Sequence, residues 1–384
     1  MMNALARPRN DFYEDMHAQF RETIRRFAAQ HIIPHIAEWE QAGLPPRSFW
    51  RACGEAGLLC PQIAVQWGGP GLDFSFNAVI AEELGYLGLP PGLLVHSDIV
   101  ADYIARYGND EQRARWLPGM VSGDIVGAIA MTEPQAGSDL QGMRAAATRE
   151  GDHYRLNGAK TYITNGLCAD IVIVAARTDA EAGARGIGLL VVENGMAGFE
   201  RGRALDKIGQ HSGDTAELFF HDVPVPGANL LGREGGGFAA LMESLPQERL
   251  AIAIMAQASA QRAFDEAVAY TRERRAFGRR VLDLQNTRFV LADLKAQLQV
   301  GWAHIDMCIK RHLDLELDNA AASAAKLWHT ELQWKCCDTA LQLHGGAGYM
   351  NEYAIARLWK DSRVTRIFGG TSEIMKEIIG RRIG

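Results

Sequence analysis

Hydrophobic residues recur with a helical period in the first and the last third of the chain. Near the start, Phe20, Ile24, Phe27 and Ala28 follow one another at helical spacing, with arginines between them. A longer series in the last third steps in the same way: Leu291, Leu294, Leu298, Trp302, Ile305 and Ile309. A continuous apolar stripe predicts an amphipathic helix, and a stripe of this length predicts packing in a helical bundle.

Further helices are predicted from the same spacing and from residues that start or end helices. They cover about 75–87, 98–107, Asn109 or Asp110 to near Gly119, about 320–343, and a last stretch from Ser372. Pro246, followed by a carboxylate and an apolar run, predicts a helix start that places Glu248 in the first turn. Glu82 and Glu83 are adjacent on a helix, where their side chains diverge, so we interpret them as structural or surface residues.

The period changes at Ile125, where short apolar and β-branched runs begin. Strands are predicted at about 125–131, 144–149, 153–156, 171–176, 187–193 and 216–221. Tight turns are predicted at Glu150-Gly151-Asp152, Asn157-Gly158 and Asn165-Gly166. Several short strands joined by turns are typical of a small antiparallel barrel or sandwich, and the sequence contains no strand–GxGxxG–helix unit of a dinucleotide-binding fold.

These patterns predict an α+β protein of several domains. The expected parts are an N-terminal α-helical domain over residues 1–124, a middle antiparallel β-barrel or sandwich domain over 125–234, and a C-terminal four-helix bundle domain over 235–384. A glycine-rich linker at 232–237 separates the last two parts.

Composition and charge limit the classes of function that the chain can have. The chain has 384 residues, and its net charge of −6 argues against a general nucleic-acid surface, although it leaves room for a local basic pocket. The six cysteines form no CxxC pair and no Cys/His cluster with zinc spacing, so we expect reduced thiols, a cytoplasmic protein and no bound metal. Met1 to Asn10 lacks the apolar core of a signal peptide and is too short for a transit peptide, and no run of about 18 apolar residues predicts a membrane span.

Two distant stretches carry a family resemblance. They are Leu245-Pro246-Gln247-Glu248-Arg249-Leu250-Ala251-Ile252-Ala253 and Ile367-Phe368-Gly369-Gly370-Thr371-Ser372-Glu373-Ile374. Together they resemble the acyl-CoA dehydrogenases, most closely the long-chain type, and the similarity covers about residues 11–383. The resemblance implies an α, β, α architecture, FAD bound between the middle domain and the C-terminal helices, and oxidation of a saturated medium- or long-chain acyl-CoA to the trans-2-enoyl-CoA.

The resemblance also implies where the catalytic base lies. In much of the family a glutamate occupies the position of Gly369, whereas the isovaleryl and long-chain branches take the base from the helix that holds Glu248. Glu248 is therefore the expected base, and the backbone N–H of Gly369 is the expected donor to the thioester oxygen. Seen alone, a glutamate at a helix start would instead complement the helix dipole or pair with a cation. Further substrate contacts are expected from Ser138, Arg185, Pro246, Gln247, Arg249 and Gly370.

Several stretches match the contacts that the family makes to FAD. The expected contacts are Met131, Thr132, Gly137, Ser138, Tyr162, Ile163, Thr164, Arg274, Phe277, Gln285, Gln342, Leu343, His344, Gly345, Gly346, Thr371, Ser372 and Glu373. Arg274, Phe277 and Gln285 are expected to reach the FAD of a neighbouring subunit, which implies a homotetramer. Tyr162 replaces the family's usual tryptophan, and strand alternation would place it on one face with Thr164. Each stretch also has an ordinary interpretation: a strand-to-loop turn, a β-hairpin, a solvated arginine run or a glycine helix cap.

Other functions stay open. On the same fold, the alternatives are an isovaleryl-like or branched-chain dehydrogenase, an acyl-CoA oxidase, an enoyl-CoA reductase or a flavin oxidase of another substrate; a flavin-free helical interaction protein is the alternative from another class. The expected electron acceptor is an electron-transfer flavoprotein. Acyl chain length depends on residues such as Leu94 and Ile99, and Ala239 stands where long-chain relatives carry a bulky aromatic. His344 is expected to be a core histidine rather than a base, and a solvated loop arginine is the alternative for Arg185.

Overall fold

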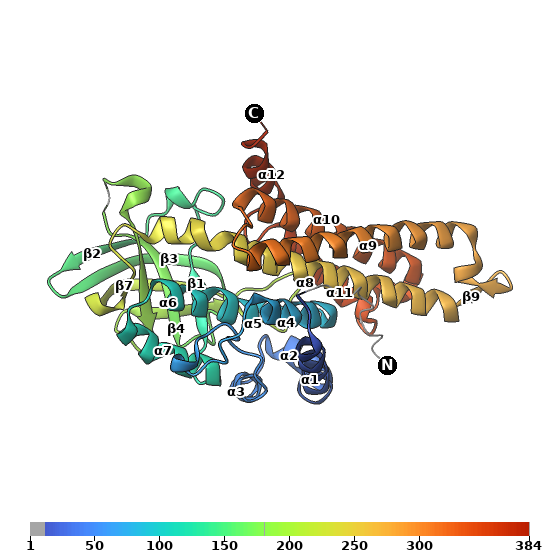
Figure 1. Cartoon of the computed structure of the whole chain (residues 1–384), viewed down its shortest axis with the longest axis horizontal. Helices are drawn as coiled ribbons and strands as arrows, with labels where there is room; N and C mark the ends of the chain where they lie inside the picture. Colours follow the sequence, from blue (N-terminus) through green and yellow to red (C-terminus); the bar gives the residue numbers. More distant parts are fainter. Residues whose placement is uncertain (1–11, 180, 384) are drawn as a thin grey trace.

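The molecule is elongated, with a β-sheet at one end and long helices that extend to the other (Figure 1). The N-terminal helices lie along one side of it. The computed structural model describes residues 12–179 and 181–383, so Met1 to Asn10, where no signal peptide is expected, lie outside the described part.

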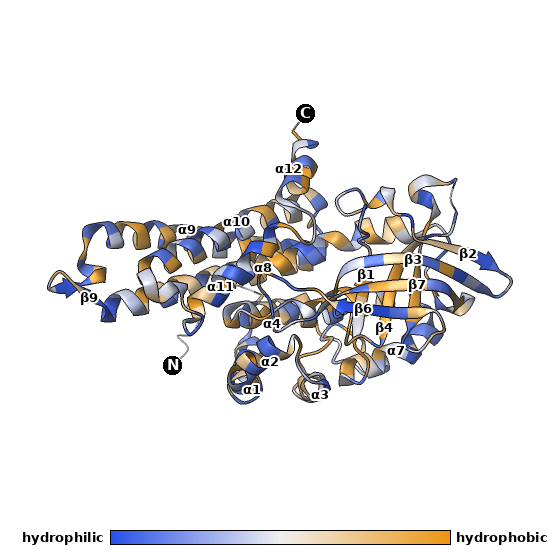
Figure 2. Ribbon diagram, turned by 180° about the vertical axis from the view of Figure 1, so that it is seen from behind, coloured by the Kyte–Doolittle hydropathy of each residue, from blue (hydrophilic) through white to orange (hydrophobic). Residues whose placement is uncertain are grey.

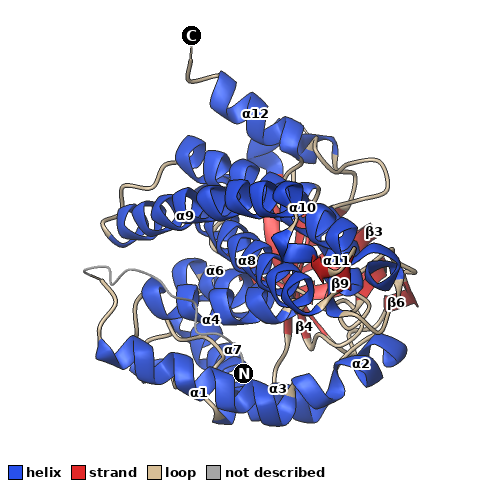
Figure 3. Cartoon of the chain, turned by 90° about the vertical axis from the view of Figure 1, so that its right-hand side faces the viewer, coloured by secondary structure: helices blue, strands red, loops and turns tan. Residues whose placement is uncertain are grey.

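The N-terminal part is helical, as the apolar spacing predicts. Its elements are α1 Asp15–His31, α2 Ile36–Ala42, α3 Arg47–Glu55, α4 Phe74–Leu87, α5 Gly92–Leu94, a π-helical turn Val95–Val100, α6 Ala101–Tyr107 and α7 Asp110–Ser122. Asn109 caps α7 by accepting a hydrogen bond from the backbone N–H of Gln112 at 2.8 Å. Every residue of α4 is buried, because this helix lies between α1 and the long helix α8, Gly237–Glu273 (Figure 3).

Glu82 and Glu83 on α4 are structural, but they are not surface residues. Both are buried, and Arg21 of α1 pairs with Glu82 at 2.7 Å and with Glu83 at 2.8 Å. Arg25 adds a second cation beside Glu83, with its Nη2 2.9 Å from Oε1. Burial without partners would be costly for either carboxylate, so these pairs hold α1 on α4.

The middle part is one eight-stranded sheet. Its strands are β1 Gly127–Ala130, β2 Ala146–Glu150, β3 His153–Thr164, β4 Ile171–Arg177, β5 Ile187–Glu193, β6 Phe199–Ala204, β7 Thr215–Pro226 and β8 Leu230–Leu231. They lie in the order β6-β7-β3-β2-β4-β5-β8, with β1 beside β4. The pairing is antiparallel, as predicted, except that β1 and β2 both run parallel to β4.

Strands β4 and β5 are apolar along their whole length because both of their faces are buried. On one face, Ile173 and Leu189 pack in the same cluster as Tyr103 of the N-terminal helices. On the other face, Val172 and Leu190 belong to the sheet's own core. Figure 2 shows β4 and β7 as largely apolar and the exposed end of β2 as polar. The N-terminal helices therefore cover the sheet rather than forming a separate body.

Two features of the sheet differ from the prediction. Asn157-Gly158 is not a turn: it lies within β3, where Gly158 takes a φ of +143° at a register shift against β7. The Asn157 side chain donates to Asp222 on β7 at 2.9 Å, so it serves the strand pairing. The sequence pattern also misses β6, because the polar run from Glu200 to Arg203 shows no apolar alternation.

The C-terminal part is a helical bundle, and its long apolar stripe is buried as predicted. Its elements are α8, the short strands β9 Arg275–Ala276 and β10 Arg279–Arg280, α9 Gln285–Leu313, α10 Asn319–His344, α11 Ala354–Ser362 and α12 Ser372–Gly380. All the predicted stripe residues of α9 are buried. Figure 3 shows α8, α9 and α10 close together, with α12 projecting from them.

The prediction that a helix begins at Pro246 is wrong. Helix α8 begins at Gly237, and Pro246 lies inside it. A proline lacks its own backbone N–H and strains the preceding turn, but a long, well-packed helix tolerates this loss. Glu248 therefore lies well inside the helix. It is too far from the helix start to complement the helix dipole, which was the ordinary role considered for it.

A buried ion pair fixes the loop that follows β1. Glu133 accepts hydrogen bonds from the backbone N–H groups of Arg144 at 2.6 Å and Ala145 at 2.9 Å. Lys160 of β3 donates to Glu133 at 2.8 Å and to the Met131 carbonyl at 2.9 Å. The side chains of this pair are 0% and 2% exposed. The pair therefore ties the loop to β3 from inside the protein.

Lys160→Met should destabilise the protein, because Glu133 would keep a buried charge without its cation. Breaking a buried pair costs about 3–5 kcal/mol of unfolding free energy, which urea denaturation followed by circular dichroism would measure. Arg155→Met is the matched control, since Arg155 lies on the same strand but its pair with Glu150 is exposed, so little change is expected. Equal losses in the two variants would contradict the role given to the buried pair.

Candidate active site

Glu248 is a buried carboxyl in α8. The residue is 5% exposed, and the Tyr103 hydroxyl donates to its Oε1 at 2.9 Å. Burial raises the pKa of Glu248 to about 7, while the Tyr103 hydrogen bond and the nearby Arg249 charge oppose that rise. A carboxyl whose pKa lies near neutrality is a usable proton acceptor.

The turn Gly369-Gly370 lies against the same face of α8 as Glu248. Gly369 has a φ of +65° and Gly370 a φ of +98°, which favour glycine at both positions. A Cβ built on Gly369 would lie 2.5 Å from Ile252 Cδ1. Because Ile252 is one helical turn after Glu248, the Gly369 backbone and the Glu248 side chain approach each other on one face of the helix.

Arg249 holds this turn from α8. Its Nε donates to the Gly369 carbonyl at 3.4 Å, and its Nη1 donates to Ser323 Oγ at 3.2 Å. Lys326 of α10 donates to the next carbonyl, that of Gly370, at 2.5 Å. Arg249 is 3% exposed, so any contribution that it makes to substrate binding acts through the turn.

Gln247 is engaged on another side of α8. Its Nε2 donates to the Asp98 carbonyl at 2.9 Å, and its Oε1 accepts from Arg106 at 3.1 Å and lies 3.2 Å from His312 Nε2. These contacts join α8 to α6 and α9, and the substrate contact expected of Gln247 stays a prediction. Pro246 lines a surface cavity of about 330 Å³ beside the same residues.

The loop after β1 forms the second part of the site. Met131 and Thr132 are half-buried, whereas Gly137 and Ser138 are exposed. The Thr132 carbonyl accepts from the backbone N–H of Thr161 at 2.9 Å, which holds the loop beside β3. The loop thus offers hydroxyl and peptide groups that a polar ring edge of a ligand can bond.

Tyr162 interrupts β3 beside this loop. It has a φ of +60°, is 69% exposed and lies in a register shift between Lys160 and Ile163. Holding a non-glycine residue in this conformation costs about 1–3 kcal/mol, and such residues cluster at functional sites. Regular alternation therefore fails here, but Tyr162 and the half-buried Thr164 both avoid the core. Ile163 is 3% exposed and packs in the core, so it can meet a cofactor only through its main chain.

Arg274 and Phe277 lie at the opposite end of α8. Arg274 follows the last residue of the helix, and Phe277, at the tip of the β9–β10 hairpin, is 91% exposed. Gln285 is also exposed and opens α9. Figure 1 shows this hairpin at the end of the bundle farthest from the sheet. One chain therefore does not bring these residues to Tyr162.

The turn Gly345-Gly346 lies at the same end. His344 stacks on Tyr270 of α8 with ring centroids 4.3 Å apart, and its Nδ1 lies 2.7 Å from the Ala340 carbonyl. It is buried, as expected for a core histidine. A Cβ on Gly345 or Gly346 would meet no atom within 4 Å, so a ligand has room to approach the backbone. The last turn of α10 also carries the other two expected contacts, Gln342 and Leu343.

The start of α12 has two residues that serve the fold. Thr371 caps the helix by accepting from the backbone N–H of Ile374 at 3.3 Å. Ser372 is buried, and its hydroxyl donates to Glu331 at 2.9 Å. Glu373 is exposed in the first turn, so it is the most accessible of the three expected contacts.

Arg185 lies in a broad groove at the edge of the sheet. The groove has a volume of about 890 Å³ and is also lined by Arg144, Arg149 and Arg177. Guanidinium groups bind phosphates through paired hydrogen bonds, so the groove suits a phosphorylated ligand. The sequence pointed to Arg185 alone, because the other three arginines come together only through the pairing of β2 and β4.

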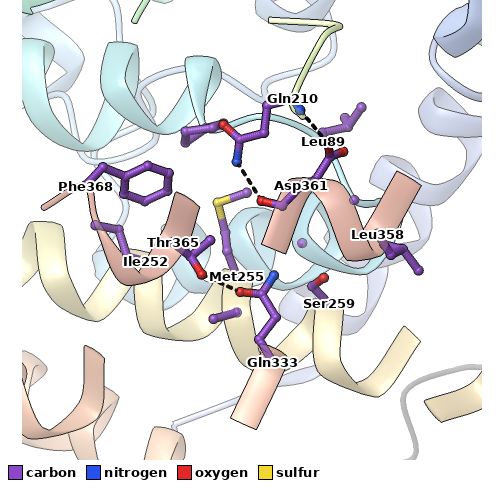
Figure 4. A pocket seen from close by; sticks show the side chains of 14 residues that line it. Leu89, Gln210, Ile252, Met255, Ser259, Gln333, Leu358, Asp361, Thr365 and Phe368 are labelled. Carbon is purple, nitrogen blue, oxygen red and sulfur yellow. Dashed lines mark hydrogen bonds between the residues drawn. The ribbon is translucent and has the colours of Figure 1, made fainter. Parts of the chain in front are cut away.

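A small cavity continues along α8 beyond Glu248 (Figure 4). Ile252 and Met255 line it from α8, and Phe368, which precedes Gly369, lies across from them. Thr365, which also lines it, donates to Gln333 at 2.8 Å. The cavity next to the Gly369 turn therefore has an apolar wall at Ile252, Met255 and Phe368, and polar side chains such as Gln210 and Asp361 elsewhere.

Tyr103 and Lys326 are site residues that the sequence did not single out. Each of them lies in surroundings that require a polar partner for its side chain. Tyr103 lies in the buried first half of α6, where a tyrosine hydroxyl must find a partner. Lys326 follows a run of alanines and a serine in α10, where a charged side chain needs a partner as well. Neither signal identifies the partner.

Residues 12–179 and 181–383 contain no group of histidine, cysteine, aspartate or glutamate side chains that could hold a metal ion. No helix in the same residues is long and apolar enough to cross a lipid bilayer.

Known proteins resemble this chain in sequence and in fold. Models of the acyl-CoA dehydrogenase N-terminal, middle and C-terminal domains match residues 14–124, 128–223 and 235–384. The mitochondrial long-chain specific acyl-CoA dehydrogenase of Sus scrofa is 49% identical over 374 residues, which cover 97% of this chain and 87% of the relative. The mitochondrial isovaleryl-CoA dehydrogenase of Oryza sativa subsp. japonica is 35% identical and covers 97% of this chain and 92% of its own length. A crystal structure of acyl-CoA dehydrogenase from Geobacillus kaustophilus superposes with a TM-score of 0.96 at 46% identity, over 98% of this chain and 100% of that one. This chain therefore belongs to the acyl-CoA dehydrogenase family of oxidoreductases.

Proposed function

We propose that this enzyme oxidises a saturated acyl-CoA of medium or long chain to the trans-2-enoyl-CoA, with Glu248 as the base that removes the α-proton. One observation carries the proposal. A buried carboxyl with a pKa of about 7 lies on the face of α8 that packs against Gly369, where the chain has no carboxylate of its own. The position of the carboxylate thus follows the long-chain and isovaleryl branches.

The residues of this chain supply the proton transfer. The α-proton of a thioester becomes removable when donors hold the carbonyl oxygen as negative charge develops on it. The backbone N–H of Gly369 is the proposed donor, and Glu248 accepts the proton. Burial makes Glu248 a stronger base than an exposed carboxylate, and the Tyr103 hydrogen bond keeps its pKa from rising further. FAD, when bound, accepts the β-hydrogen as a hydride.

The described residues fit FAD in two groups. The loop at 131–138 and the strand at 162–164 offer hydroxyls, peptide groups and an exposed aromatic ring beside the sheet. The hairpin at 274–277 and the open turn at 345–346 offer a guanidinium group and close backbone approach, which suit phosphates. Because one chain holds these groups at opposite ends of α8, we propose that a neighbouring subunit of a homotetramer supplies the second group.

Similarity to known enzymes supports the proposed acyl chain and electron acceptor, and the arginine groove supports the proposed binding of CoA. Arg185 and its neighbours would hold the phosphates of CoA. The 49% identity to a long-chain dehydrogenase favours a medium or long acyl chain and an electron-transfer flavoprotein as acceptor. An isovaleryl or branched-chain enzyme, an acyl-CoA oxidase and an enoyl-CoA reductase are the alternatives.

All six cysteines are free thiols, which suits a reducing compartment such as the cytoplasm.

Glu248→Gln should abolish reduction of the flavin, because an amide keeps the shape of the side chain but accepts no proton. Anaerobic titration with a saturated long-chain acyl-CoA, followed by the loss of flavin absorbance, measures the effect. We expect bleaching to slow by about 100- to 10,000-fold. Glu243→Gln is the matched control, since Glu243 is exposed on the same helix, and it should bleach at the normal rate. Near-normal bleaching of Glu248→Gln would show that another group is the base.

The same titration of the unchanged enzyme separates the substrate classes. Bleaching that is strongest with long chains supports the proposed substrate, whereas bleaching with short branched acyl groups alone would favour the isovaleryl type. Oxygen consumption without another acceptor would point to an oxidase. An FAD-containing protein that no acyl-CoA bleaches would contradict the proposed reaction.

Tyr103→Phe should move the acid side of the pH–rate profile to higher pH. The Tyr103 hydrogen bond favours the carboxylate form, so its removal raises the pKa of Glu248 further. Only the carboxylate accepts a proton, so flavin reduction should slow more on the acid side than on the alkaline side of neutrality. Stopped-flow measurement across this range tests the shift. Tyr107→Phe is the control, because the Tyr107 hydroxyl bonds Glu243 instead; equal profiles for the two variants would contradict the assignment.

A further inference from the structure

Lys326 is a buried lysine that contacts a carbonyl instead of a carboxylate. It lies in α10, is 0% exposed, and its Nζ donates to the Gly370 carbonyl at 2.5 Å. In the described part of the chain it forms no ion pair with an aspartate or glutamate. Burial first, and then the nearby Arg249 charge, lowers the pKa of Lys326 to about 7, while the charges of Glu331 and Glu373 oppose this shift. A lysine kept in such an unfavourable place needs an explanation beyond packing.

Two cations from two helices hold the two carbonyls of one turn. Arg249 of α8 donates to the Gly369 carbonyl at 3.4 Å, and Lys326 of α10 donates to the Gly370 carbonyl. Glycine peptide planes rotate freely, so a pair of glycines would otherwise leave this turn in many orientations. Holding both carbonyls fixes the two peptide planes that follow Gly369 and Gly370. The Gly369 N–H belongs to the preceding plane, so the two contacts anchor the turn that carries it. No group in the described part of the chain accepts a hydrogen bond from that N–H.

The charges around this turn match a proton transfer. Before the transfer, Glu248 carries the negative charge, close to Arg249. When Glu248 takes a proton, the negative charge passes to the thioester oxygen, which the Gly369 N–H holds. Arg249 and Lys326 hold the two carbonyls of the same turn, so both lie near the place to which the charge moves. While both groups are protonated, their charges are already in place, and no reorganisation is needed as the charge moves.

We propose that Lys326 is a positioning residue for α-proton removal: it fixes the Gly369-Gly370 turn and places a positive charge behind the oxygen that becomes negative. The inference rests on the proposed function, in which the Gly369 N–H holds the thioester oxygen. It differs from a purely structural role, because it ties Lys326 to the acidity of the bound substrate. A lysine that only filled the core would leave that acidity unchanged.

The test uses the FAD-containing enzyme and a 3-thiaacyl-CoA, an analogue that cannot complete the reaction. Its α-carbanion gives a long-wavelength charge-transfer absorbance with oxidised flavin, and a pH titration of that absorbance gives the apparent pKa of the bound α-proton. Lys326→Met keeps the aliphatic stem but removes the donor and the charge. Lys335→Met is the matched control: Lys335 lies on the same helix, is exposed and pairs with Asp293 at 2.9 Å.

We expect Lys326→Met to raise the apparent pKa of the bound analogue by at least about one unit, a tenfold loss of acidity. The kcat for acyl-CoA should fall by about ten- to a hundredfold with little change in KM, because the effect arises as charge develops. Lys326→Gln should lie between Lys326→Met and the control, since its amide still donates to the Gly370 carbonyl. Lys335→Met should match the unchanged enzyme.

A Lys326→Met protein whose analogue pKa and kcat equal those of Lys335→Met would overturn the proposal. If Lys326→Met does not retain FAD, the Lys326→Gln variant is measured in its place. An analogue pKa and a kcat equal to those of Lys335→Met overturn the proposal. A raised analogue pKa together with a lowered kcat supports it. Failure of the proposed function is distinct from either result, because the unchanged enzyme would then give no charge-transfer absorbance with the analogue.

Discussion

The burial of opposite charges at one point of α8 is the constraint on which the rest of the site depends. Glu248 and Arg249 are consecutive and are 5% and 3% exposed, so water cannot solvate either of them. Each must find polar partners within the protein. Glu248 finds Tyr103 in the N-terminal helices, and Arg249 finds Ser323 in α10 and the Gly369 carbonyl near the C-terminus. This requirement ties three distant parts of the chain together at the place where the chemistry is proposed.

The length of α8 determines how the site is divided. The helix runs over 37 residues, which at about 1.5 Å per residue exceeds 50 Å. Glu248 lies in its first half, near the sheet and the 131–138 loop, whereas the arginine hairpin follows its last residue. A single straight helix cannot bring its two ends to one ligand. The two groups of expected cofactor contacts are therefore separated in the chain by the same element that holds the proposed base, Glu248.

Periodic patterns in the sequence predicted most of the fold. Local signals gave wrong predictions at positions whose structure depends on contacts with distant parts of the chain. The α9 stripe was foreseen because its burial follows the helical period, and the β4 and β5 strands because each is a short continuous apolar run. Pro246 suggested a helix start, but the packing of α8 overrides that local signal. Asn157-Gly158 suggested a turn, but pairing with β7 keeps it in a strand. The roles of Tyr103 and Lys326 could not be predicted, since their partners lie 145 and 44 residues away in the sequence.

The closed space at Gly369 has an evolutionary consequence. A carboxylate-bearing residue there would adopt a left-handed backbone, which costs about 1–2 kcal/mol, and its Cβ would displace the tip of Ile252. On the proposed mechanism, removing Glu248 first would leave no base, and adding a glutamate at 369 first would crowd two carboxyls into one space. Neither order of single substitutions then passes through a well-functioning intermediate. The two ways of placing the base are thus separated by epistasis.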